Sequence, residues 1–185
     1  MKVHTTELPG VLVIEPDVYR DDRGYFLETF RAERYAAHDI PTEFVQDSLS
    51  WSREGVLRGL HLQWPHAQGK LVSVLSGAVF DVAVDLRRDA ETFGRWTGHV
   101  LSAQDARQMW IPPGFAHGFL VTQGPALFAY KSTHPYDPES ELDVRWDDPA
   151  IGIDWPSAAP RLSAKDATAP LLATIDPARL PRENY

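Results

Sequence analysis

The sequence contains no cysteine, so disulfide bridges and thiolate-bound metal centres are excluded. No apolar run approaches the roughly 18 residues that a membrane-spanning helix needs. Lys2, His4 and Glu7 interrupt the start of the chain, so we expect no membrane span and no secretory leader. Basic residues are in deficit, with 18 Lys and Arg against 26 Asp and Glu and a net charge of −8. This balance disfavours a nucleic-acid partner, although a local basic cluster can still bind a small phosphorylated ligand.

The chain has 185 residues, of which 43% are hydrophobic and 24% charged. This composition is typical of a globular protein with a sizeable buried core. We therefore expect one domain over residues 1–185, with N-terminal strands and a C-terminal tail as appendages. The tail, from Pro156 onward, is rich in proline and alanine, and we expect it to wrap the surface.

Helical patterns are scarce, and only residues 32–38 and 163–172 favour short helices. Residues 71–75 and 78–85, joined by Ser76 and Gly77, predict a β-hairpin. Further strand-like segments recur about every ten residues with Gly, Pro or Asp between them; they are residues 11–15, 25–30, 96–101, 108–111, 119–121 and 127–133. Such spacing predicts an all-β sandwich or barrel.

One strand-like stretch, "GVLRGLHLQWPHAQGK" over residues 55–70, carries charge where apolar residues are expected. Arg58 and His61 lie three apart, which puts them on opposite faces of a regular strand. A bulge at Gly59 would turn both to one face. Solvated charges on an edge strand, or a core histidine bonded to a backbone carbonyl, explain the same pattern.

Four other stretches place polar residues in unusual settings, each with a simpler interpretation. "WIPPGFAHGFLV" over residues 110–121 holds His117 in a rigid apolar turn. A histidine there is also explained as a residue that only hydrogen-bonds to the loop. "FAYKSTHPYDPESE" over residues 128–141 contains Tyr130, which is also explained as an ordinary aromatic residue of the hydrophobic core. In "LSAKDA", Asp166 matches a capping box, and "DDRGYFLE" over residues 21–28 matches a solvated hairpin.

Taken together, these stretches resemble the dTDP-4-dehydrorhamnose 3,5-epimerase family over nearly the whole chain. Eight ordered blocks carry the resemblance: "DDRGYFLETF" (21–30), "FVQDSLS" (44–50), "GVLRGLHLQ" (55–63), "QGKLVSVLSGAVFDVAVDLR" (68–87), "TFGRW" (92–96), "IPPGFAHGF" (111–119), "YKSTHPYDPESE" (130–141) and "LSAKD" (162–166). The resemblance implies an all-β jelly roll of the cupin type, a double-stranded β-helix with a few short helices. It also implies a homodimer in which some site residues come from the neighbouring subunit.

The resemblance further implies conversion of dTDP-4-dehydro-6-deoxy-D-glucose to dTDP-4-dehydro-L-rhamnose. Hydrogens next to the C4 ketone leave as protons and return on the opposite face, so the reaction needs no cofactor and no metal. His61 matches the general base and Asp166 the carboxylate that orients it. Tyr130 matches the acid on the other face, and Lys70 the cation that stabilises the enolate.

The remaining matches imply substrate binding, with arginine suited to the diphosphate and Tyr136 to stacking on thymine; they are Arg23, Glu28, Gln46, Asp47, Ser48, Arg58, His117, Tyr136, Glu141 and Lys165. Ser48 departs from the family, which usually has Asn there, so its contact differs. The resemblance also implies a cytoplasmic enzyme that binds neither nucleic acid nor membrane.

Three alternatives remain. An epimerase that acts on one carbon only would share these motifs. A metal-dependent cupin is suggested by "PPGFAH", but Leu62 and Gln63 follow His61 where a second ligand would stand, so we expect no cluster of three metal ligands. A sugar-binding cupin without activity would keep the cations but lose the acid or the base.

Overall fold

The protein, described here by a computed structural model over residues 1–183, is an all-β jelly roll. Its strands are β1 (Lys2–Thr5), β2 (Leu12–Glu15), β3 (Val18–Asp21), β4 (Gly24–Leu27), β5 (Gln46–Ser52), β6 (Leu57–Gln63), β7 (Lys70–Asp85), β8 (Trp96–Ser102), β9 (Gln108–Ile111), β10 (Phe115–Ser132) and β11 (Glu141–Asp143). Helices α1 (Ala32–Ala36) and α2 (Ala164–Ala167) and two 3-10 turns (Leu172–Thr174, Pro177–Arg179) complete the described elements.

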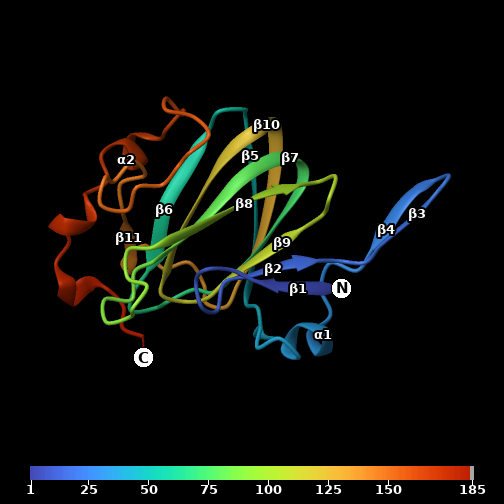
Figure 1. The fold of residues 1–185 in the computed structure, drawn as a ribbon, viewed down its shortest axis with the longest axis horizontal. Helices are drawn as coiled ribbons and strands as arrows, with labels where there is room; N and C mark the ends of the chain where they lie inside the picture. The colour runs from blue at the N-terminus through green and yellow to red at the C-terminus, as the bar shows by residue number, and fades with distance from the viewer. Residues whose placement is uncertain (184–185) are drawn as a thin grey trace.

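Two long strands, β7 and β10, form the spine of the barrel (Figure 1). They pair antiparallel with each other along most of their length. β9 and β8 pair with successive halves of β7, while β5 and β6 pair with successive halves of β10. Each long strand therefore belongs to both layers of the barrel, and the barrel is one continuous hydrogen-bonded network.

The predicted hairpin at Ser76 and Gly77 is wrong, because β7 continues through both residues. Gly77 has φ 77°, and a Cβ there would collide with the carbonyl oxygen of Gln123 on β10. The register between the two strands shifts several times between Val121 and Phe128. Gly77 therefore bends the strand but does not reverse the chain. The segments predicted as separate strands over 119–121 and 127–133 both belong to the single strand β10.

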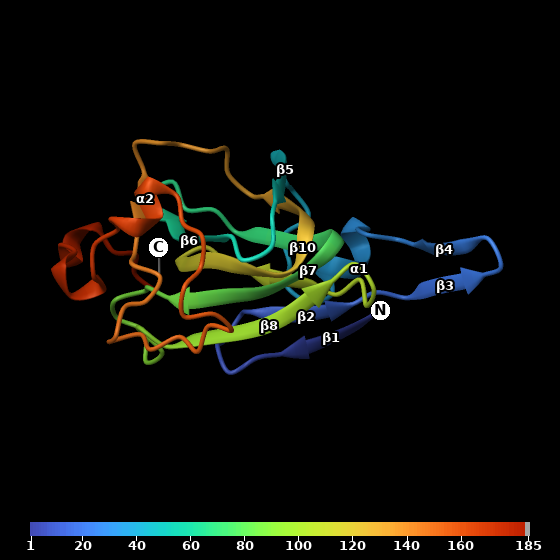
Figure 2. The ribbon, with the colours of Figure 1, turned by 90° about the horizontal axis from the view of Figure 1, so that it is seen from above.

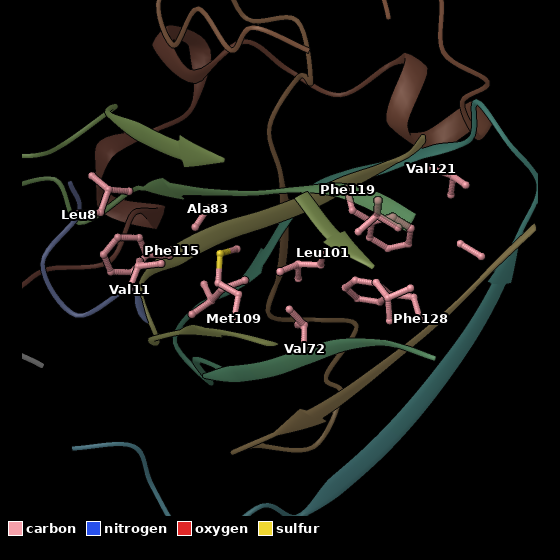
Figure 3. Close-up of a cluster of buried hydrophobic side chains, with 14 residues drawn as sticks. Leu8, Val11, Val72, Ala83, Leu101, Met109, Phe115, Phe119, Val121 and Phe128 are labelled. Carbon is pink, nitrogen blue, oxygen red and sulfur yellow. The ribbon is translucent and has the colours of Figure 1, made fainter. Parts of the chain in front are cut away.

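The barrel interior is apolar over much of its volume (Figure 3). Val72, Leu101, Met109 and Phe128 lie between the layers and are at most 1% exposed. A second cluster covers the outer face of the β6, β7 and β10 layer, where side chains from residues 142–180 pack on Leu60 and its neighbours. The C-terminal segment therefore packs against the sheet, as the sequence suggests, and Pro170 stops the predicted 163–172 helix at Ala167.

The hairpin of β3 and β4 projects away from the barrel (Figure 2). Tyr19, Tyr25 and Phe26 on it are 64%, 54% and 71% exposed. The strand predicted over 25–30 thus ends at Leu27 and lies outside the barrel. Among the described residues, no helix is long and apolar enough to cross a bilayer.

Candidate active site

A pocket of about 320 Å³ opens between the layers of the barrel. Strands β5, β6, β7 and β10 and the α2 segment supply its walls; the lining residues are Ser50, Arg58, His61, Lys70, His117, Phe119, Phe128, Tyr130, Ser163, Lys165 and Asp166. Phe119 and Phe128 stack with centroids 4.2 Å apart and form an apolar wall. The pocket therefore gathers cations, a carboxylate and two potential proton carriers around one apolar surface.

Arg58 and His61 reach this pocket together because β6 is irregular between them. His117 on β10 pairs with His61, and Phe119 pairs with Arg58, so two residues of β6, Gly59 and Leu60, oppose the single Gly118 of β10. Gly59 lies in this bulge with φ 129°, and a Cβ there would stand 2.5 Å from the Cα of Gly118. The predicted bulge at Gly59 is confirmed, and only glycine fits it.

His61 and Asp166 form a close pair although 105 residues separate them. Nε2 of His61 lies 2.6 Å from Oδ1 of Asp166. Burial opposes ionisation of Asp166, but hydrogen bonds from His61 and Ser163 lower its pKa below the usual value. An ionised Asp166 requires Nε2 of His61 to carry hydrogen, which leaves Nδ1 as the basic nitrogen in neutral imidazole.

Asp166 also has the structural role expected from its sequence. Ser163 caps α2, accepting a hydrogen bond from the Asp166 backbone N at 3.1 Å and donating to Oδ2 at 2.7 Å. The two carboxylate oxygens therefore have separate partners. The helix cap holds the carboxylate in the orientation in which it meets His61.

Tyr130 and Lys70 line the same pocket as His61. Tyr130 lies on β10 and Lys70 begins β7, two strands that pair side by side at this point. Desolvation lowers the pKa of Lys70 to about 8, although Glu141 and Asp81 oppose that shift. The ammonium group is thus still charged at neutral pH and sits in a weakly solvated site.

His117 has a buried carboxylate partner that the sequence motifs do not single out. Its Nε2 lies 2.9 Å from Oδ2 of Asp81, which is fully buried on β7. Burial raises the pKa of Asp81, and the charge of His117 counteracts this. The signal in the sequence is an aspartate within the apolar run "AVFDVAV", where an unpaired charge would be costly.

Strand β5 places the hydroxyl of Ser50 in the pocket and that of Ser52 against Arg58, because alternate side chains of a strand share a face. Ser52 accepts a hydrogen bond from Nε of Arg58 at 3.0 Å. Ser50 lines the pocket, and its buried Oγ has no hydrogen-bond partner among the described residues. Ser50 is therefore a further candidate contact for a ligand, which only the strand's alternation could have indicated.

A smaller chamber of about 130 Å³ adjoins the pocket and shares His61, Lys70 and Tyr130 with it. Gln46, Tyr136 and Glu141 line its other side. Nζ of Lys165 lies 2.7 Å from Glu141 and 3.0 Å from Asp143. Although burial acts the other way, the two carboxylates raise the pKa of Lys165.

The expectation that three metal ligands do not cluster is wrong. Ligand atoms of His61, Glu141 and Asp143 lie within 4.8 Å of one another. Pairing of β11 with β6 places Asp143 opposite His61, a juxtaposition that spacing along the chain cannot reveal. The ammonium group of Lys165 contacts both carboxylates.

Ten of the fourteen predicted site residues line the two chambers, and four do not. Arg23 lies in the projecting hairpin and pairs with Asp21, and Glu28 pairs with Arg34. Asp47 faces outward and binds Lys131 at 3.0 Å. Ser48 accepts a hydrogen bond at 3.0 Å from Gln46, which lines the smaller chamber, but Ser48 itself lines neither chamber.

Comparison with known proteins agrees with this geometry. The family model described as dTDP-4-dehydrorhamnose 3,5-epimerase matches residues 5–174. A protein of that name from Salmonella typhimurium is 51% identical over 175 residues, covering 93% of this chain and 96% of the relative.

Two solved structures share the fold. The Legionella pneumophila dTDP-6-deoxy-D-glucose-3,5-epimerase, in complex with dTDP-4-keto-L-rhamnose, superposes with TM-score 0.96 at 51% identity, covering 100% of this chain and 99% of that one. A 3′-monoepimerase from Streptomyces bikiniensis in complex with dTDP-quinovose gives TM-score 0.90 at 33% identity, covering 97% and 92%. Sequence, fold and pocket thus agree that this chain belongs to the dTDP-4-dehydrorhamnose 3,5-epimerase family.

Proposed function

We propose that this protein is a dTDP-4-dehydrorhamnose 3,5-epimerase that converts dTDP-4-dehydro-6-deoxy-D-glucose to dTDP-4-dehydro-L-rhamnose. The observation that carries the proposal is the shared pocket of His61, Lys70 and Tyr130, with Asp166 bonded to His61. A base, a cation and a phenol around one cavity are the groups that inversion next to a ketone requires. The family of this chain supports the same reaction.

In the proposed mechanism, Nδ1 of His61 removes the hydrogen next to the C4 ketone as a proton. The electron pair of the broken C–H bond forms the enolate, whose oxygen is stabilised by the Lys70 ammonium. The phenol of Tyr130 delivers a proton to the opposite face of the same carbon. Before the second inversion, the imidazolium releases its proton to solvent and the phenolate takes one up, so protons alone balance both inversions and this route draws on no metal and no redox cofactor.

Asp166 assists by stabilising the imidazolium that His61 becomes. We propose that Arg58, His117 and Lys165 bind the diphosphate and the sugar, and that Ser50 adds a hydroxyl contact. Gln46, Tyr136 and Glu141 line the adjoining chamber, where Tyr136 would stack on thymine. Ser48 would act through Gln46, to which it is bonded.

We further propose that the protein works as a homodimer. The hairpin of β3 and β4 carries Arg23 away from this chain's own pocket and exposes three aromatic side chains. On β5, Leu49 and Trp51 are also exposed, and large exposed apolar side chains of this kind favour a partner. In a symmetric pair, the hairpin of one subunit would bring Arg23 and Glu28 to the pocket of the other, while Asp47 would lie at the interface.

Two general properties complete the proposal. We propose that residues 1–185 act as one domain, because the sheet joins β1 to β11 through continuous pairing. We also propose a cytoplasmic location, since a cysteine-free chain needs no oxidising compartment. Fractionation of the native cells checks the location, and a single cooperative unfolding transition checks the domain.

The deciding experiment is NMR of the product formed from dTDP-4-dehydro-6-deoxy-D-glucose in deuterated water. We expect deuterium at both C3 and C5 and the L-rhamno configuration. Deuterium at one carbon only would identify a monoepimerase, such as the Streptomyces bikiniensis relative. No exchange at all would contradict the proposal and favour a binding protein, and loss of exchange after chelator treatment would favour a metal-dependent enzyme at His61, Glu141 and Asp143.

A further inference from the structure

A loop beside the smaller chamber, residues 133–140, carries Tyr136 and leads directly into Glu141; we call it the Tyr136 loop. It faces the connection between β6 and β7, residues 64–69. At one end, the backbone N of Thr133 donates to the carbonyl of Gly69 at 3.0 Å, and the N of Gly69 donates to Oγ1 of Thr133 at 2.8 Å. At the other end, the N of Trp64 donates to the carbonyl of Ser140 at 2.8 Å.

Between these ends, side chains from the two segments meet. Nδ1 of His66 lies 2.6 Å from Oδ2 of Asp137, and Oγ of Ser140 donates to the same oxygen at 2.6 Å. The His66 ring also stacks on that of His134, with centroids 5.1 Å apart and planes 7° apart. Two contacts of different kinds thus join residue 66 to the middle of the Tyr136 loop.

Gln63, the last residue of β6, also forms hydrogen bonds to the Tyr136 loop. It is only 4% exposed. Its Oε1 accepts from the backbone N of Asp137 at 3.0 Å, while Nε2 donates to the carbonyls of Pro135 at 3.2 Å and His66 at 2.9 Å. Because Gln63 lies two residues after His61, the loop is fixed to the strand that carries the proposed base.

The carboxylate at the centre of this network stays charged at any working pH. Hydrogen bonds from Ser140, then His66, then the backbone of Glu139 lower the pKa of Asp137 to about 2. Because this pKa lies below the ordinary 3.8, the stabilisation is full above that value and is lost only as pH falls toward 2. His66 therefore always faces an ionised acceptor and needs hydrogen on Nδ1 to bond it.

Tyr136 itself has few restraints. Its backbone N donates to Oε1 of Gln46 at 2.7 Å and its hydroxyl donates to Glu141 at 3.1 Å. Its side chain remains 54% exposed. Ordering such a loop during binding costs conformational entropy, so contacts that order it beforehand increase affinity.

We propose that His66 and Asp137 are positioning residues that hold the Tyr136 loop in the position in which it accepts the nucleotide. We call this pair of residues the latch. This inference rests on the proposed function, because it assigns Tyr136 to the nucleoside diphosphate of the substrate. The latch acts on binding and not on proton transfer, since neither His66 nor Asp137 lines a chamber.

The test measures kcat and KM for the 4-keto sugar nucleotide and, by calorimetry, the Kd for dTDP alone. We expect His66→Ala and Asp137→Ala to raise KM and Kd about fivefold to tenfold through lost preorganisation, with kcat within about twofold of wild type. His66→Asn should restore both constants, because an asparagine amide can replace the Nδ1 donor. His134→Ala is the matched control, which removes the stacked ring but keeps the hydrogen bond, and should change KM less than twofold.

Unchanged KM and Kd in both alanine variants would overturn the latch, as would a loss of kcat with KM unchanged. Failure of His66→Asn to restore binding would also count against it, because the donor atom would not be what matters. The unfolding temperature of each variant verifies that it is folded. Wild-type deuterium exchange tests the proposed function separately, and the Kd for dTDP tests the latch even if no exchange occurs.

Discussion

Asp166 satisfies two requirements with one side chain, since Ser163 bonds one of its oxygens and His61 the other. A capping residue and a partner of a general base are usually alternative explanations for an aspartate at such a position. Here the cap fixes the direction from which the carboxylate approaches the imidazole. Local and long-range roles are therefore coupled through the same atoms.

Tyr130→Phe removes the proposed proton donor while keeping the ring that packs near Phe128. We expect deuterium exchange next to the ketone to persist, because His61 still abstracts protons, while epimerised product falls at least about 100-fold. Time-resolved NMR in deuterated water separates exchange from inversion. Full double epimerisation by this variant would remove Tyr130 from the mechanism.

Lys70→Met tests whether Lys70 contributes to activity while it lowers the stability of the folded protein. Its pKa of about 8, against the ordinary 10.5, means that the folded protein binds fewer protons than the unfolded chain between these values. Folding is thus penalised below pH 8, and the penalty fades as pH rises toward 10.5. Chemical denaturation at pH 7 should show the variant more stable by about 2 kcal/mol.

Activity of the same variant should fall about 100-fold or more through loss of enolate stabilisation. The wild-type enzyme should lose activity above about pH 8, as Lys70 loses its proton. A variant that is both active and no more stable would contradict both parts of this interpretation.

At the scale of elements, the pocket depends on short irregular features more than on regular strands. α2 spans only Ala164–Ala167, yet it places Asp166 opposite β6. The bulge at Gly59 brings Arg58 and His61 of β6 to the same pocket, and Gly77 bends β7 where it approaches β10. Each of these features depends on one or two particular residues, so single substitutions test them.

Ser163→Ala removes the cap of α2 and one partner of Asp166. We expect a loss of about 1 kcal/mol of stability and about a tenfold drop in kcat, because Asp166 loses its orientation. Ser163→Thr keeps a hydroxyl and should retain most of both quantities. Denaturation and steady-state kinetics measure them, and wild-type kcat in Ser163→Ala would show that the cap does not orient the carboxylate.

Gly77→Ala should destabilise the barrel by about 3 kcal/mol or more, because the added Cβ meets backbone atoms of β10. Gly94→Ala is the matched control: Gly94 has φ 76°, close to the 77° of Gly77, but nothing lies within 4 Å of its added Cβ. Only the backbone strain of about 1 kcal/mol applies there. Equal losses in the two variants, measured by denaturation, would mean that the close approach of β7 and β10 does not govern the bend.

At the scale of the whole molecule, the position of Arg23 distinguishes a self-sufficient subunit from a shared site. If subunits exchange hairpins, an Arg23→Ala subunit and a His61→Ala subunit are each deficient alone. In the mixed dimer, one pocket combines His61 from the first with Arg23 from the second. We expect activity to reappear when the two inactive proteins are unfolded and refolded together.

Light scattering should give the mass of two chains for each variant. Mixtures of either variant with itself, treated identically, are the controls. A mixture no more active than those controls, with mixed dimers verified by differential tagging, would contradict a pocket shared between subunits.

Residue patterns and motifs along the chain were enough to predict the fold class and most of the candidate site. Strand spacing indicated a sandwich or barrel, and ordered motifs indicated ten residues that line the chambers, including His61, Tyr130 and Asp166. The motifs sufficed because the proposed reaction restricts the residue type at each such position. They also indicated the bulge at Gly59, since only a glycine permits that backbone.

Which distant residues meet could be seen only in the folded chain. The pairing of β11 with β6 brought Asp143 to His61, folding of β7 set Asp81 against His117, and the path of the Tyr136 loop joined His66 to Asp137. The folded chain also showed that Gly77 bends strand β7, where a hairpin was expected. The physical reason is that a strand's pattern specifies its two faces but not its neighbours, which are selected by packing and pairing over the whole chain.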